Sequence, residues 1–122
     1  MEARLVESVA QLSADYTPGS AVSAGEVVTW GNNVAIATRD IAANTPGSVA
    51  MPSGTAIYDV AKEAGEGVTF AVGALVFWDA TGNTATATVT DKGLGICVKA
   101  AADGDSTVRV LHTPVRVVDT DT

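Results

Sequence analysis

The feature that most limits the fold of this chain is the strict alternation of side chains over residues 84–90. Threonine occupies every second position here, and Ala85, Ala87 and Val89 occupy the positions between. Successive side chains of a strand point to opposite faces of a sheet, so this period of two predicts a half-buried β-strand. Turn-forming residues stand before it, at 80–83, and further along, at 103–105. The surrounding stretch therefore predicts three or four strands joined by tight turns.

A weaker copy of this stretch lies earlier in the chain. Gly25 and Trp30 match Gly73 and Trp78 at a common offset (73 − 25 = 48), and a second match follows at a larger offset (96 − 36 = 60). The difference corresponds to one additional hairpin in the later copy. The matched segments are residues 23–30 with 71–78, and residues 36–39 with 96–99.

The repeat predicts two pseudo-repeated β-units packed on one core, because two units are too few for a solenoid. We expect a mainly β, compact domain resembling a small barrel or sandwich, with at most one or two short helices. Trp30 and Trp78 would end equivalent strands, so we expect both to belong to the structural core. The alternative, in which they are exposed, would make them a platform for stacking sugars.

The first thirteen residues do not follow the period-two pattern. Leu5, Val9 and Leu12 have helical spacing, and Val6 and Ala10 widen the stripe. An isolated helix of this length is nevertheless marginal in water. An extended N-terminal arm that becomes ordered against a partner is the other interpretation. In either case, we expect Leu5, Val6 and Val9 to contact a partner protein or a neighbouring subunit. The remaining boundaries predict a β-rich domain over residues 14–118 and a flexible acidic end at 119–122.

A short helix is expected in the middle of the chain. Ile57, Val60, Ala61 and Ala64 recur at positions i, i+3, i+4 and i+7, which is the spacing of one helix face. Gly65 follows as a residue suited to end such a helix.

Composition limits the size of the core and the kinds of partner. The 122 residues suit one domain, and 47% are hydrophobic although only 5% are aromatic. A core of Ala, Val, Ile and Leu buries little apolar area per side chain, so association between copies would add stability. The net charge is −7, and the seven basic residues are scattered singly. This pattern argues against binding to nucleic acid or to an anionic membrane surface.

No set of residues has the spacing that catalysis or metal binding requires. The single cysteine, Cys97, lies in an apolar strand and is expected to be a small buried core residue. His112 stands beside a proline with no nucleophile or carboxylate pattern, which predicts a solvated residue at a strand end. Residues 103–105 are too short for a calcium loop and predict a hairpin turn. We therefore expect no enzyme activity, no cofactor and no metal.

Several short motifs, taken in order, resemble a known family. The resemblance extends from Leu5 to about Leu111, although each motif is weak by itself. They are residues 15–19 (DYTPG), 22–28 (VSAGEVV), 34–37 (VAIA), 40–43 (DIAA), 47–49 (GSV), 60–62 (VAK), 77–79 (FWD), 94–96 (LGI) and 100–110 (AAADGDSTVRV). In this order the chain resembles a family of small tailed-phage and prophage proteins associated with capsid decoration, or cement, and formerly catalogued as a domain of unknown function. Two positions depart from it, Ala61 where proline is usual and Ala35 where glycine is common.

The resemblance implies a β-rich domain that binds the outside of a phage capsid, commonly as a trimer, without catalytic residues. A structural virion protein would decorate and stabilise the capsid by bridging its subunits, with the major capsid protein as partner. It would be assembled in the cytoplasm of the bacterial host and lie on the outer capsid surface. A second hypothesis is a module on the virion that binds glycans or a host surface, which requires Trp30 or Trp78 to be exposed.

Overall fold

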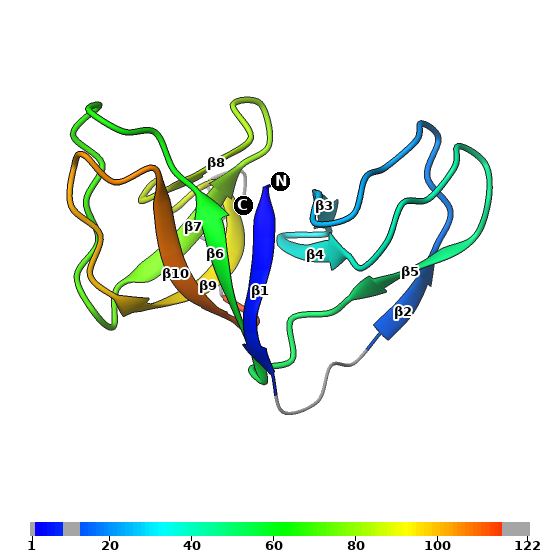
Figure 1. Cartoon of the computed structure of the whole chain (residues 1–122), viewed down its shortest axis with the longest axis horizontal. Coiled ribbons are helices and arrows are strands. Elements are labelled where there is room, and N and C mark those ends of the chain that lie inside the picture. Colours follow the sequence, from blue (N-terminus) through cyan, green and yellow to red (C-terminus); the bar gives the residue numbers. More distant parts are fainter. Residues whose placement is uncertain (1, 9–12, 116–122) are drawn as a thin grey trace.

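The computed structural model describes residues 2–8 and 13–115, which form ten β-strands and no helix. The prediction of a mainly β domain is therefore confirmed. Strand β1 stands at the front between two lobes, and most of β6–β10 lie in the larger lobe (Figure 1). The strands are β1 (Ala3–Ser8), β2 (Ser13–Tyr16), β3 (Val27–Trp30), β4 (Asn33–Ala37), β5 (Gly47–Ala50), β6 (Ala56–Ala61), β7 (Leu75–Asp79), β8 (Thr84–Thr86), β9 (Lys92–Lys99) and β10 (Thr107–His112).

The two predicted β-units are present, and they share one topology. In the first unit, β2 pairs with β5, β5 with β4, and β4 with β3, all antiparallel. In the second unit, β6 pairs with β10, β10 with β9, and β9 with β7, again antiparallel. The second unit has β8 in addition, between β7 and β9 in the chain, as the longer offset predicted.

The correspondence extends to individual hydrogen bonds. Gly25 donates its N–H to Ala37 O and Gly73 donates its N–H to Cys97 O, both at 2.8 Å. Both glycines have a positive φ, 83° and 89°, which glycine adopts without steric cost. The same offsets, 48 and 60, relate other paired residues. The pair Val22–Ile41 of the first unit corresponds to Phe70–Ala101 of the second. The pair Val27–Ile36 corresponds in the same way to Leu75–Ile96.

The expectation of one shared core is wrong, because the buried side chains form two clusters. The larger cluster fills the second unit, and the smaller one lies in the first unit. The β3–β4 hairpin separates them, since its side chains alternate: Val27 and Ile36 belong to the larger cluster, and Val28 and Ala35 to the smaller. Both faces of the hairpin are apolar, so each face has a cluster of its own.

Strand β6 replaces the expected short helix. Its side chains alternate between buried and partly exposed, with Tyr58 and Val60 inward, and it pairs with β1 on one side and β10 on the other. The helical spacing of Ile57, Val60 and Ala61 was coincidental, because pairing with two neighbouring strands outweighs a weak helical pattern in so short a segment.

The threonine-rich segment forms a shorter strand than its alternation predicts. Only Thr84–Thr86 is a strand; it pairs with β7, and an isolated parallel bridge joins Ala85 to Lys62. Residues 87–90 are exposed, and Val89 is 48% exposed. The alternation correctly predicted that the alanine face is buried at Ala85, which lies in the larger cluster. It overestimated the length of the strand, because residues 87–90 are paired with no strand.

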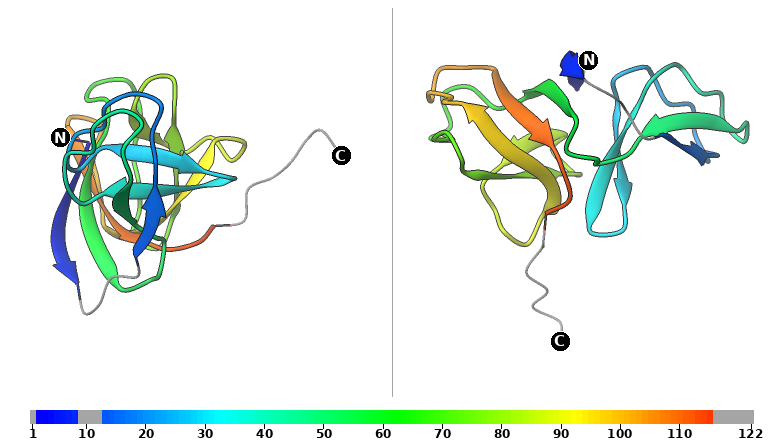
Figure 2. Two further views of the ribbon diagram at one scale, coloured as in Figure 1. Left: turned by 90° about the vertical axis from the view of Figure 1, so that its right-hand side faces the viewer. Right: turned by 90° about the horizontal axis from the view of Figure 1, so that it is seen from below.

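Strand β1 and the β4–β9 contact connect the units. Strand β1 pairs antiparallel with β6, and Ala3 also donates its N–H to Gly25 O of the first unit. Strands β4 and β9 touch in parallel at Asn33 and Gly93. The sheet path therefore runs β1-β6-β10-β9-β4-β5-β2, with β1 and β2 at its two ends. Figure 2 shows the two lobes from two further directions.

Candidate functional site

Strand β1 presents two exposed apolar side chains at the end of the sheet. Leu5 is 47% exposed and Val6 is 38% exposed, although both lie in a paired strand. A β-bulge interrupts the β1–β6 register between Leu5 and Glu7, so Val6 has no paired residue in β6. Leu5 borders a groove of about 350 Å³ that Ile36, Thr38 and Tyr58 also line. This surface has the apolar character of a protein contact. Val9, expected to join it, lies outside the described residues.

The backbone of β1 is firmly held. Ala3 is 2% exposed and lies in the larger cluster, and Ala61 donates its N–H to Glu2 O at 2.9 Å. The Glu2 carboxylate accepts the N–H of Val27 at 2.5 Å. Burial raises the pKa of Glu2, and the hydrogen bond from Val27 opposes that shift. Leu5 and Val6 thus project from a backbone that is fixed to both units.

Basic side chains lie on the face of the sheet opposite to Leu5, because Arg4 is paired with Asp59 and Leu5 with the buried Tyr58. Asp59 of β6 accepts hydrogen bonds from Arg109 of β10 at 2.9 Å and from Arg4 of β1 at 3.2 Å. These bonds, Arg109 first, hold the pKa of Asp59 below its usual value, and Asp59 raises the pKa of Arg109. The two arginines carry one more positive charge than the single carboxylate neutralises.

The two tryptophans occupy equivalent strand ends but different environments. Trp78 is 1% exposed in the larger cluster, so it offers no ring face to a sugar. Trp30 is partly buried against the smaller cluster, with its ring 6.1 Å from that of Tyr16. Trp78 is thus a member of the larger cluster, whereas Trp30 packs at the margin of the smaller one.

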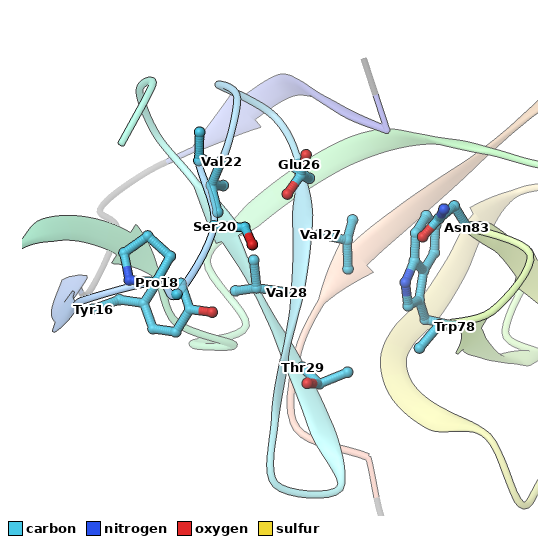
Figure 3. Close-up of a pocket in the computed structure, with 13 residues that line it drawn as sticks. Tyr16, Pro18, Ser20, Val22, Glu26, Val27, Val28, Thr29, Trp78 and Asn83 are labelled. Atoms are coloured by element: carbon cyan, nitrogen blue, oxygen red, sulfur yellow. The ribbon is translucent and has the colours of Figure 1, made fainter. Parts of the chain in front are cut away.

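A pocket of about 350 Å³ lies at the junction of the units (Figure 3). Trp78 and Asn83 line it from the second unit, and β3 passes through it with Val27 directed toward Trp78. Glu26 is the one charged residue in its lining. A single carboxylate does not form an acid–base pair, because no second carboxylate and no histidine or lysine lines the pocket beside it. The pocket is therefore better described as a gap between the packed units than as a reaction site.

His112 is a buried structural residue, and the expectation of a solvated histidine is wrong. It is 1% exposed, its Nε2 lies 2.8 Å from Val34 O, and its ring meets Tyr58 edge-on at 5.7 Å. Because Val34 O only accepts, Nε2 carries the proton and donates it. Burial lowers the pKa of His112, and the bond to Val34 opposes this. The sequence did not reveal this role, because Val34 lies far away along the chain.

Lys62 is a second buried polar residue, and sequence reasoning assigned it no structural role. It is 4% exposed, and its Nζ donates to the backbone oxygens of Glu63, Asp103 and Asp105 at 3.0, 3.2 and 2.9 Å. The ammonium group therefore holds the 103–105 turn against the end of β6. The only available signal was its place in a family motif. Cys97, by contrast, is 1% exposed as predicted.

The described ranges, 2–8 and 13–115, hold no cluster of three or more metal-ligating side chains and no helix long and apolar enough to span a membrane. They hold a fixed strand β1 with exposed apolar side chains and, on the opposite face of the sheet from Leu5, the charged group of Arg4, Asp59 and Arg109. Exposed apolar side chains on a fixed strand are typical of a protein that acts by surface contact.

The comparisons with known proteins agree with this class. The model of the phage cement protein family matches residues 8–112, so the chain belongs to the phage cement protein family. The suspected resemblance is thereby confirmed, and the chain has a structural, capsid-associated role. No curated protein and no solved structure matches the chain.

Proposed function

We propose that this protein decorates the outer surface of a tailed-phage capsid, where it binds the major capsid protein and bridges neighbouring capsid subunits. It acts without catalysis, as a homo-oligomer and most simply as a trimer, after assembly in the cytoplasm of the bacterial host. The observation that supports this proposal best is the exposed pair Leu5 and Val6 on the firmly held strand β1 of a cement-family chain.

The proposed mechanism is shared burial of apolar surface. Burying a Leu or Val side chain completely contributes about 1.5–3 kcal/mol, and Leu5 and Val6 begin half exposed, so each copy gains about half of that per residue. A fixed β1 backbone reduces the conformational entropy that is lost on docking. Each docked copy that touches two capsid subunits lowers the free energy of the closed shell relative to separated subunits.

Substituting Leu5 with aspartate tests the proposal. We expect Leu5→Asp to remain folded, because the side chain is 47% exposed, and to weaken co-sedimentation with capsids about tenfold or more. The matched control is Val89→Asp, since Val89 is 48% exposed in the turn before β9 and does not border the groove at Leu5. Equal binding of the wild type and Leu5→Asp would remove β1 from the contact. Failure of the wild type to co-sediment with capsids would remove the proposed function itself.

A point substitution is sharper here than a deletion. Removing residues 1–13 also removes Ala3 from the larger cluster and leaves β6 without its outer partner. Loss of binding after such a deletion would therefore not distinguish a lost contact from a damaged fold.

A further inference from the structure

An aliphatic row crosses the outer face of the second unit. Leu75 of β7 is opposite Ile96 of β9, Ile96 is opposite Leu111 of β10, and Leu111 is opposite Ile57 of β6. Paired residues share a face of the sheet, so the four side chains lie side by side across four strands. Leu75 is 50% exposed, and the other three are partly exposed. Their neighbours along β6 and β10, such as Tyr58 and Val110, point inward and are buried.

The equivalent row in the first unit is covered. Val27 of β3, Ile36 of β4 and Ala50 of β5 occupy the matching paired positions. They are 7%, 1% and 1% exposed, and Val27 and Ile36 pack into the larger cluster of the second unit. The same row of the same fold is thus buried by the chain itself in one unit and left open in the other.

A charged row runs beside the open aliphatic row. Arg4 is opposite Asp59, Asp59 is opposite Arg109, and Arg109 is opposite Lys99. Three cations and one anion give this row a net charge of +2, while the whole chain carries −7. The rest of the chain therefore carries −9 (−7 − 2 = −9). Asp105 lines one pocket with Asp59, Lys99 and Arg109, so with Arg4 the three cations and two anions here sum to +1 (3 − 2 = +1). The outer face is therefore apolar with a weakly positive edge on an otherwise acidic protein.

We propose that the outer face defined by Leu75, Ile96, Leu111 and Ile57, together with its charged row, is the contact surface between copies of this chain. It packs on a different, acidic surface of the next copy. A face with a net positive charge does not pair favourably with itself, so the contact is heterologous and closes into a ring, whereas a two-fold dimer would oppose like charges. This inference rests on the homo-oligomer of the proposed function, and it names the surface through which the copies of that oligomer touch.

The experiment is the mass of the full chain in solution, measured by light scattering over a range of protein concentrations. We expect the wild type and the control Val89→Asp, 48% exposed in a turn outside the paired row, to form the same small ring. Leu75→Asp should associate about tenfold or more weakly and approach the mass of one subunit. Leu75→Thr removes the apolar contact but keeps a strand-forming residue, and it decides the question if Leu75→Asp does not fold.

Charge provides a second readout. Lys99→Glu reverses one charge of the row at an exposed position, so we expect weaker association, and added salt should weaken association of the wild type. A wild type that stays a single subunit at every concentration would overturn the proposal, as would folded Leu75 variants with wild-type mass. A variant that keeps its mass but loses capsid binding would assign the face to the capsid instead. Capsid binding by Leu5→Asp is a separate measurement, so the two proposals fail independently.

Discussion

Single buried polar residues are the points at which this structure is most sensitive to substitution. Each of them bonds to backbone oxygens of segments far away along the chain. Lys62 and His112 both bond to carbonyl oxygens, and both are almost fully buried. A buried acceptor that loses its donor costs free energy, because water does not replace the bond.

Lys62→Met should destabilise the fold by about 1–3 kcal/mol, since it removes the ammonium donor from three carbonyl oxygens, of which Asp103 O keeps a second donor, the N–H of Gly65. We also expect faster amide exchange in residues 103–105, where two of those carbonyls lie. Chemical denaturation and hydrogen exchange measure the two effects. Lys99→Met, at an exposed position, is the matched control, and equal losses in both variants would contradict the anchoring role.

His112 should make stability depend on pH below neutrality. Its pKa is lowered in the folded protein from 6.5, so below pH 6.5 the unfolded chain binds the proton more tightly. The free energy of unfolding should therefore fall as the pH decreases from 6.5 toward 5. His112→Gln, which does not titrate, should be less stable at pH 7 and should lose less on acidification. Parallel pH profiles of the two proteins would show that other groups cause the slope.

At the scale of elements, β-bulges and glycines determine how the strands approach one another. The register of β9 against both β7 and β10 is interrupted. Gly95 lies between these irregularities, and a Cβ placed there would lie 2.0 Å from Leu111 O. The strand pairing therefore requires glycine at this position.

Gly95→Ala should destabilise the protein by about 1–3 kcal/mol or more, because β9 and β10 must separate to admit the methyl group. Thermal unfolding measures the loss. Gly104→Ala is the control, since no atom lies within 4 Å of its added Cβ and its φ is not positive. A midpoint for Gly95→Ala equal to that of the control would show that the sheet adapts without cost.

Ala61 shows how one substitution can add a hydrogen bond between two strands that are already paired. Its N–H donates to Glu2 O, whereas proline, usual at this position in the resembling family, has no N–H to donate. The departure adds a bond that holds the start of β1 against the end of β6.

At the scale of the whole molecule, the two units share a topology but differ in the number and size of the side chains buried in their cores. The larger cluster includes Trp78, Tyr58 and Leu94, whereas the smaller contains Val, Ile and Ala at its centre. Local opening requires less free energy where less apolar surface is buried. We expect amides of β5 to exchange faster than amides of β10, its equivalent strand, in the isolated protein. Equal protection in both strands would indicate a single cooperative unit.

The sequence by itself determined the class of fold and the internal repeat. Alternation of side chains and the recurrence of Gly25 and Trp30 at Gly73 and Trp78 are local features, and local features survive in any β arrangement. The family was also within reach of the sequence, because it depends on the order of short motifs.

Only the tertiary structure decided which strands lie beside one another, and with that the surfaces. The division of the core by β3–β4, the strand at residues 56–61, the burial of His112 and the outer row of Leu75, Ile96 and Leu111 all depend on pairings between distant segments. Residue spacing along the chain does not specify such pairings. They follow from the burial of apolar faces summed over the whole molecule, which no single segment contains.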